Sequence, residues 1–223
     1  MNRFVLALLA AAALALVARP AAAAPKESAT AAVRAANDRL RAALDEYAKA
    51  KGPARHAARE KVRKAVDSLI DFDEIVHAAA GKHWNEMTPE QRKRFSAALR
   101  GVMESSYLLK GHEAGSVDVS RVKTEYLGEE KRGGKTIVKT RLHSGQDNAR
   151  VDYVLEQHNG RWRAVDILTE DVSLAETYGE QIHELWSKRG FEGVISTLER
   201  KRKNLESKLD AELPAAAQEG ASR

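Results

Sequence analysis

Histidines are the side chains here best suited to bind a metal ion or to transfer a proton, and the chain has seven. His77 and His83 are six residues apart, so on a helix they would face different sides, and neither has a second histidine at a zinc spacing. His183 precedes Glu184 but lacks the second histidine of an H-E-x-x-H motif. We therefore interpret these histidines as surface or partly packed residues and predict no metal site.

Carboxylates gather in "DFDE", residues 71–74, where they could act as an acid–base pair or bind a divalent ion. Their position at the start of a predicted helix favours capping and interaction with the helix dipole instead. The nucleophile elbow G-x-S-x-G, the P-loop and G-x-G-x-x-G are missing from the sequence. A hydrolase with a triad assembled from distant residues remains an alternative, but we predict neither an enzyme nor a cofactor.

The N-terminus has the pattern of a secretory signal peptide. Arg3 is followed by an apolar run of 14 residues from Phe4 to Val17 and by small residues up to Ala24. This run is short compared with the ~20 residues that span a bilayer, which argues against a retained anchor. No cysteine is present, so disulfides, thiolate metal sites and a lipidated cysteine are excluded. We predict that residues 1–24 are removed and that the mature chain is exported.

The charge pattern excludes a nucleic-acid reader. The formal charge is +5, and removing Arg3 and Arg19 with the signal peptide lowers it by two, to +3. Basic and acidic residues alternate along the chain, whereas nucleic-acid binding needs a concentrated basic face, often with stacking aromatics. Aromatic residues make up only 5% of this sequence.

The elements that would position any site begin with helices over residues 26–112. Residues 26–69 are rich in Ala, Lys, Arg and Glu, and "KGP" at 51–53 predicts a break between two helices. Asp71 or Asp73 can cap a helix that ends at Gly81. Thr88 and Gln91 form a capping box for the next helix. The broad apolar face of this last helix consists of Phe95, Leu99, Val102, Met103, Ser106 and Tyr107.

After Gly111 the hydrophobic period changes from helical to alternating, which predicts a sheet over residues 117–168. The four expected strands are Val117–Leu127, Lys135–Leu142, Ala149–Gln157 and Arg161–Leu168. Short turns at 133–134 and 159–160 make the sheet antiparallel. Apolar residues alternate with polar ones on the second and third strands, so one face should be covered by helices and the other exposed to water.

A second capping box at Ser173 starts a helical region over residues 173–209, which Gly190 divides in two. Asp166, on the preceding strand, is expected to fix a neighbouring donor. Residues 210–223 are small and polar and should form a disordered tail. The order of elements predicts one α+β domain over residues 25–209, in which helices pack on one face of a four-stranded antiparallel sheet.

Two stretches carry a more specific pattern. "LIDFDEIVHAAAGKHWNEMTPEQRKRFSAALRGVMESSY" has an acid-aromatic-acid start, then Gly81, Trp84 and "TPEQR". "VDYVLEQHNGRWRAVDILTEDVSLAETYGEQIHELWSKRGFEGVISTL" has V-x-Y on one strand, W-x-x-x-D on the next, an acid before "VSL" and a Gly-aromatic-x-Gly turn. In this order they resemble the MlaC (toluene-tolerance) family of periplasmic phospholipid carriers. The resemblance covers about Leu69 to Leu198, and it departs at Asp171, where the family has a glycine in a tight turn.

The resemblance implies a soluble periplasmic shuttle that carries phospholipid between the outer and inner membranes. Its implied partners are the substrate-binding ring of an inner-membrane ABC transporter and an outer-membrane lipoprotein–porin complex. A single lipid cavity favours a monomer. The acyl tails would lie in an apolar pocket between sheet and helices, and we expect the following residues to line it: Phe95, Leu99, Met103, Tyr107, Val138, Leu142, Tyr153, Leu155, Val165 and Ile167.

Two other interpretations of the same sequence stay open besides the hydrolase. Related carriers are linked to hopanoids, so the cargo could be another apolar lipid, such as a hopanoid or a quinone-like molecule. An apolar sheet face opposed by apolar helices is also what a solid core presents, so an exported adaptor that binds only envelope proteins fits the same pattern.

Overall fold

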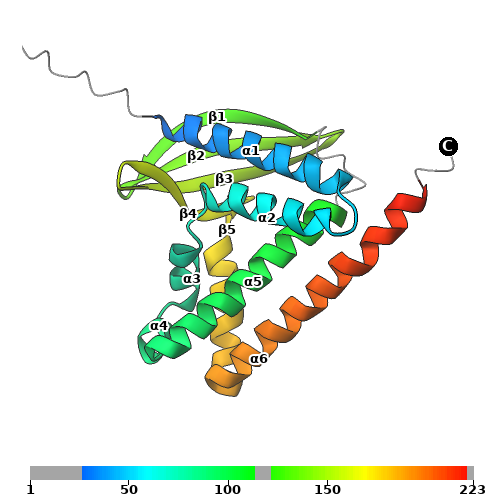
Figure 1. The fold of residues 1–223 in the computed structure, drawn as a ribbon. Helices are drawn as coiled ribbons and strands as arrows, with labels where there is room; N and C mark the ends of the chain where they lie inside the picture. The colour runs from blue at the N-terminus through cyan, green and yellow to red at the C-terminus, as the bar shows by residue number, and fades with distance from the viewer. Residues whose placement is uncertain (1–26, 114–121, 220–223) are drawn as a thin grey trace, which may run out of the picture.

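The computed structural model describes residues 27–113 and 122–219, with side chains for 27–107 and 122–209. Within these residues, helices α1 to α5 precede an antiparallel sheet and the long helix α6 follows it (Figure 1). This confirms the predicted α+β class. The predicted signal peptide, residues 1–24, lies outside the described residues.

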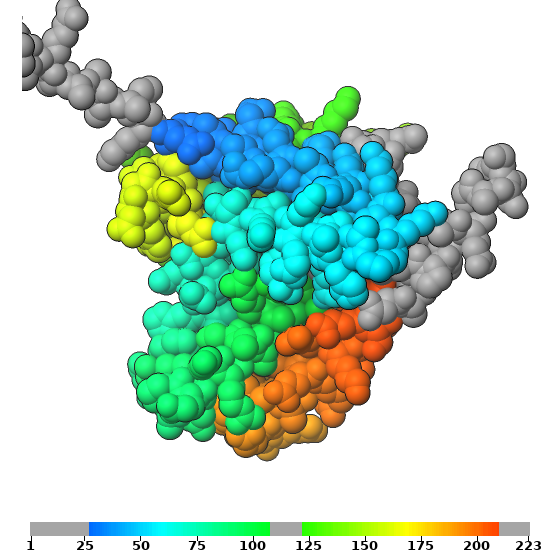
Figure 2. All heavy atoms as spheres, in the orientation of Figure 1, coloured from blue at the N-terminus to red at the C-terminus, as the bar shows by residue number. Residues whose placement is uncertain are grey.

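The first two helices are α1 (Ala29–Lys49) and α2 (Ala54–Asp67). Ser28 caps α1 by accepting a hydrogen bond from the backbone N–H of Ala31 at 3.1 Å. The predicted break between the two helices is present, and Gly52 takes a φ of 54° in it. Figure 2 shows α1 and α2 lying across the upper part of the molecule, above α5 and the orange part of α6.

The next three helices are α3 (Phe72–Ala80), α4 (His83–Glu86) and α5 (Pro89–Glu113). Asp71 caps α3, as predicted, and Gly81 ends it with a φ of 54°. The capping box of α5 is also present: Gln91 Oε1 accepts from Thr88 N at 2.9 Å, and Thr88 Oγ1 accepts from Gln91 N at 3.2 Å. The short α4 was not predicted.

The sheet consists of β1 (Lys123–Arg132), β2 (Lys135–Ser144), β3 (Asp147–His158), β4 (Arg161–Thr169) and the two-residue β5 (Val172–Ser173), in that order. All neighbours are antiparallel, as predicted, but β5 adds a short fifth strand. β1 continues to Arg132, beyond the predicted end at Leu127. Its last residues are mostly charged, as is common in an edge strand, so no apolar alternation marked them in the sequence.

The register places apolar residues on one face of the sheet. Val138 lies opposite Tyr153, and Tyr153 lies opposite Ile167 on the other side. These three residues join the main hydrophobic cluster together with residues from α1, α3, α5 and α6. The helices therefore pack on one face of the sheet, as predicted.

The turn between β4 and β5 forms although Asp171 replaces the family glycine. Glu170 and Asp171 have φ values of 49° and 66°, so both residues adopt the left-handed conformation of a two-residue hairpin turn. Arg150 forms an ion pair with Asp171, and its backbone N–H donates to Glu170 Oε1 at 2.6 Å. These contacts support a backbone conformation that glycine adopts more easily.

Helix α6 (Leu174–Glu219) runs as two arms joined at Gly190, where φ is 61° and ψ is −170°. The break at Gly190 was predicted, whereas the disordered tail was expected from residue 210 and the structure continues the helix to Glu219. The first arm runs away from the sheet, and the second returns beside α5 toward α1 and α2 (Figure 1). Residues 220–223 lie outside the described residues.

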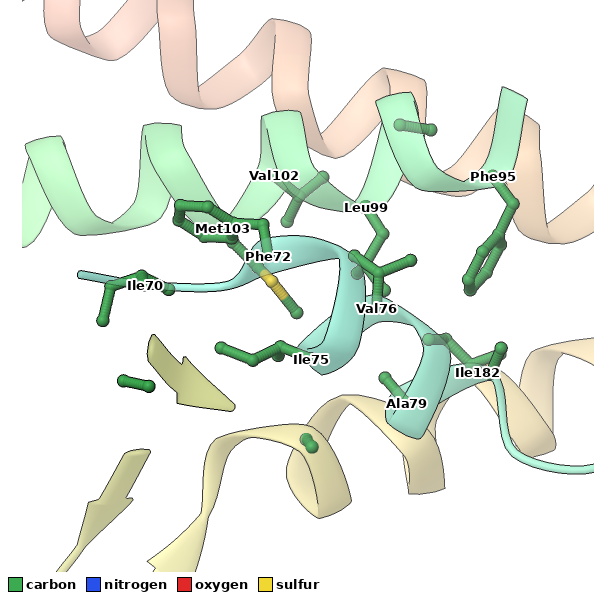
Figure 3. Packing of buried hydrophobic residues seen from close by; sticks show 14 of the residues in the cluster. Ile70, Phe72, Ile75, Val76, Ala79, Phe95, Leu99, Val102, Met103 and Ile182 are labelled. Atoms are coloured by element: carbon green, nitrogen blue, oxygen red, sulfur yellow. The ribbon is translucent and has the colours of Figure 1, made fainter. Parts of the chain in front are cut away.

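Two hydrophobic clusters hold these elements together. The main cluster joins the sheet to α1, α3, α5 and α6, and in Figure 3 Val76 of α3 lies between Leu99 of α5 and Ile182 of α6. The second cluster joins the ends of α1, α2 and α6, and it consists of Ala43, Tyr47, Ala58, Val62, Ala65 and Leu209. Leu205 of α6 packs against both clusters.

Asp166 connects β4 to the start of α6, as expected from the sequence. Its Oδ1 accepts hydrogen bonds from the backbone N–H of Ile167 at 2.8 Å and of Ala175 at 3.2 Å. The Ser173 hydroxyl donates to Asp166 Oδ2 at 2.5 Å and accepts from Glu176 N at 3.0 Å. One carboxylate thus serves the last long strand and the first turn of the helix.

We expect Asp166→Ala to lower the free energy of unfolding by about 2 kcal/mol, because it leaves two backbone donors and a hydroxyl without their acceptor. Asp166→Asn keeps an acceptor oxygen and should lose no more than about half as much. Urea denaturation of the two variants beside the unmodified protein measures both values. Equal losses in the two variants would show that the hydrogen bonds to Asp166 are not the source of its contribution.

Candidate binding cavity

A small cavity lies where α2 crosses the start of α3 and the C-terminal half of α5. Its volume of about 30 Å³ has room for about one or two water molecules. It separates part of the second cluster, at Val62, from the main cluster, at Phe72. The lining residues are Arg59, Val62, Arg63, Val66, Asp67, Phe72, Glu104 and Tyr107.

Tyr107 is the cavity residue whose surroundings are most unusual. Its side chain is 40% exposed, although burial raises the pKa of its hydroxyl and the nearby Tyr153 raises it further. Tyr107 is thus partly exposed to solvent and also lines the cavity. Tyr107 therefore marks a place where α5 does not close against its neighbours.

Tyr153 connects this region to the sheet and to α1. Burial raises the pKa of Tyr153 to about 12. Its hydroxyl donates a hydrogen bond to Asn37 Oδ1 at 3.1 Å. Asn37 Nδ2 donates in turn to the hydroxyl of Tyr126 at 3.2 Å. The side chain of Asn37 thus joins α1 to β1 and β3 above the apolar face.

Charged side chains of α2 and α5 line the cavity, and Glu206 of α6 lies near one of them. Arg100 donates to both oxygens of Asp67, at 2.6 and 2.8 Å, and to Glu104 at 2.7 Å. Arg63 lies 3.1 Å from Glu104, whereas the closest approach of Arg59 to Glu206 is 3.9 Å. Arg100 therefore offsets the charges of both lining carboxylates, and Arg59 is the cation with the weakest pairing.

The structure places the ten predicted pocket residues in four different settings. Eight of the ten lie in or beside the main cluster or the cavity. The fully buried members of the main cluster are Phe95, Leu99, Met103, Val138 and Leu155. Tyr153 and Ile167 are partly buried against that cluster, and Tyr107 lines the cavity.

Leu142 and Val165 differ from the other predicted pocket residues, because neither of them belongs to a hydrophobic cluster or lines the cavity. Leu142 is half-buried. Val165 is the extra residue of a β-bulge, since Leu155 pairs with Ala164 and Val154 pairs with Asp166. The alternation of Val165 with Ile167 assumed for a regular strand is therefore interrupted.

The histidines form one arrangement that sequence spacing did not reveal. His83 is 5% exposed, its Nε2 lies 3.0 Å from His183 Nδ1, and its Nδ1 lies 3.1 Å from Glu86 Oε2. The ring of Trp186 stacks on His83 with 4.5 Å between centroids. His83 is thus buried rather than on the surface. Among the described residues, no group of three or more His, Cys, Asp or Glu side chains is arranged to hold a metal ion.

Arg59 and Arg63 could not be singled out from the sequence, because residues 26–69 have the composition of ordinary packing helices. The available signal was the recurrence of arginine every fourth residue at 55, 59 and 63, which places these side chains on one face of α2. That pattern is common on exposed helices. Only the position of α2 above the cavity distinguishes this face.

Within residues 27–113 and 122–219, no helix is both long and apolar enough to cross a membrane. A solved structure of the phospholipid-binding protein from Ralstonia solanacearum, in complex with a phospholipid, has the same fold. The TM-score is 0.67 at 23% sequence identity, and the match covers 80% of this chain and 99% of that one.

The sequence model of the MlaC protein family matches residues 34–200. This match includes most of α1 and all of α2, which precede the stretch from Leu69 to Leu198 where the sequence motifs resemble the family. It also covers the sheet, the cavity residues and the first arm of α6. Because it spans well over half of the sequence, the chain belongs to the MlaC protein family.

Proposed function

We propose that this protein is a periplasmic phospholipid carrier, exported by a cleaved signal peptide and acting as a monomer without enzymatic activity. It takes phospholipid between the outer and inner membranes. Its partners are the substrate-binding ring of an ABC transporter at one membrane and a lipoprotein–porin complex at the other. The observation that carries the proposal is the family match over residues 34–200, and the phospholipid in the solved structure of like fold supports it.

Physical chemistry explains why such a carrier needs no catalyst. Each methylene removed from water contributes roughly 0.8 kcal/mol, so two acyl chains represent on the order of 20 kcal/mol. Free phospholipid therefore does not cross an aqueous compartment without a container. A bilayer shelters the same chains about equally well, so transfer between membrane and carrier is nearly balanced, and the partners set its direction.

The cavity between α2 and α5 is much smaller than a lipid. Pockets for small-molecule ligands are roughly 300–1,000 Å³, at least tenfold larger than the cavity of about 30 Å³ seen here. Lipid uptake therefore requires the two hydrophobic clusters to move apart along the cavity. We call this boundary between the two clusters the seam. Arg59, which pairs only weakly with Glu206, and Tyr107 both lie on it.

We expect the mature protein, purified from a bacterial periplasm, to carry one phospholipid. Native mass spectrometry should show a mass excess of a single phospholipid that disappears on denaturation, and lipid extraction should identify it. A bound mass that matches a hopanoid or a quinone-like lipid would show that the protein is a carrier with a different cargo. A lipid-free mass from folded protein that had been offered phospholipid vesicles would contradict the proposal.

An exported adaptor is the second candidate, because the small cavity volume favours a filled core. An adaptor binds envelope proteins and stays lipid-free in the same mass measurement. A hydrolase, in contrast, would release a headgroup or fatty acid from added phospholipid, and one serine or histidine substitution would stop the release.

A further inference from the structure

Arg59 of α2 combines three properties at the edge of the cavity. It lines the cavity beside Val62, its side chain is 21% exposed, and its Nε is buried without a hydrogen-bond partner among the described residues. Its closest carboxylate oxygen, in Glu206, is 3.9 Å away. Buried polar groups in native proteins are nearly always hydrogen-bonded, so an unpaired guanidinium nitrogen at a cavity indicates a missing partner.

The neighbouring charges do not supply that partner. Asp67 and Glu104 also line the cavity, but Arg100 binds both of them with hydrogen bonds of 2.6 to 2.8 Å. Arg63, one helical turn from Arg59, shares Glu104 at 3.1 Å. Arg59, Arg63 and Arg100 thus compete for the carboxylates at this edge of the cavity. Of the three, Arg59 has the weakest pairing with a carboxylate.

Arg55 shows that an unpaired Nε alone does not make a site. Its Nε is also buried without a hydrogen-bond partner in the described part of the chain. However, its guanidinium lies over the ring of Tyr47, 4.7 Å from the centroid, and it does not line the cavity. Of the described arginines with an unpaired Nε, Arg59 alone lines the cavity.

We propose that Arg59, assisted by Arg63, binds the phosphate of the phospholipid whose tails enter beside Val62 and Tyr107. This inference rests on the proposed function and adds the group that recognises the headgroup. An apolar wall beside a cation matches an acyl chain attached to a phosphodiester. A guanidinium presents two parallel N–H donors to phosphate oxygens, and such charge-assisted bonds are about twice as strong as neutral ones.

The test is a competition between two lipids with the same tails. Vesicles containing equal mole fractions of dioleoyl phosphatidylglycerol and dioleoylglycerol are incubated with the protein, and native mass spectrometry gives the ratio of the two bound masses. All variants meet the same vesicles, so differences in escape from the bilayer cancel when ratios are compared. Arg59→Gln should lower the ratio of phospholipid to dioleoylglycerol about tenfold.

Arg55→Gln is the matched control, because it removes a guanidinium from the same helix outside the cavity, and its ratio should equal that of the unmodified protein. Circular dichroism checks that both variants are folded. An unchanged ratio in Arg59→Gln, with both lipids bound, would overturn the phosphate assignment and leave the carrier intact. If the unmodified protein bound neither lipid, the proposed function itself would fail.

Inorganic phosphate is the same kind of anion without acyl tails. It tests whether the arginines bind the phosphate of a lipid or a free phosphate ion. Titration calorimetry of lipid-free protein with millimolar inorganic phosphate should show no binding, because nothing apolar then opens the seam between the clusters. Phosphate binding that Arg59→Gln abolishes would assign the site to a free anion instead of a lipid.

Discussion

Replacing Tyr107 by aspartate should produce a folded protein that carries no phospholipid. Tyr107 lines the cavity and is 40% exposed, so its replacement leaves few buried contacts unmade. If the tails enter beside Tyr107, as proposed, the same position contacts acyl chains in the loaded protein. Arg59 and Arg63 line the same cavity, but in the loaded protein they are proposed to bind the phosphate. An ionised carboxylate at position 107 then loses its water without gaining a free donor, which costs several kcal/mol.

This cost translates into at least a hundredfold loss of lipid loading, since each 1.4 kcal/mol changes an equilibrium about tenfold. Loading is measured by native mass spectrometry after incubation with phospholipid vesicles. The free energy of unfolding, from urea denaturation, should fall by about 1 kcal/mol, as is typical of a half-exposed residue. Aspartate is preferred to glutamate or lysine here, because a longer side chain could carry its charge out to water.

Tyr107→Phe is the control, because it keeps the ring and removes only the hydroxyl. It should load lipid as well as the unmodified protein does. Full loading of a folded Tyr107→Asp protein would place the tails elsewhere, away from the cavity between α2 and α5. Loss of loading in both variants would assign the effect to the hydroxyl and not to the charge.

The predictable parts of this fold are those that neighbours in sequence determine. The capping box at Thr88 and the hydrogen bond from Glu176 N to the Ser173 hydroxyl join residues three positions apart, so the sequence alone specifies them. Gly190 ends a helical arm because it adopts a backbone conformation that other residues avoid. The two family motifs are also readable from the sequence, and their order along the chain identifies the fold as a whole.

The cavity could not be predicted, because it depends on distances between residues far apart in sequence. Val138 and Tyr107 both belong to apolar patterns, yet one is fully buried and the other faces a hollow. Nothing in the two patterns distinguishes an apolar face that packs against protein from one that contacts lipid. Likewise, the weak pairing of Arg59 depends on where the second arm of α6 places Glu206. In the sequence the whole sheet and the break at Gly190 lie between these two residues.

The second large effect concerns Phe95, which the sequence placed with Tyr107 among the residues that contact lipid. In the structure Phe95 has no exposed surface, and its ring points from α5 toward the part of the core where Val76 and Ile182 lie (Figure 3). We expect Phe95→Ala to lower the free energy of unfolding by about 3–5 kcal/mol, because it removes an aromatic ring and leaves a cavity. Most single domains are stable by only about 5–15 kcal/mol, so this variant is near the limit of folding.

Phe95→Leu is the control, since it keeps an apolar side chain in the core, and it should cost less than half as much in urea denaturation. If Phe95 is core, any Phe95→Ala protein that folds should load phospholipid normally, and its loss of stability should be the same with and without lipid. This pattern is the reverse of the one expected for Tyr107→Asp. A Phe95→Ala protein that lost under 1 kcal/mol yet could not hold lipid would contradict the core assignment. It would return Phe95 to the lipid-contacting set that the sequence predicted, and it would mean that the lipid enters between α3 and α5, deeper than the cavity at Tyr107.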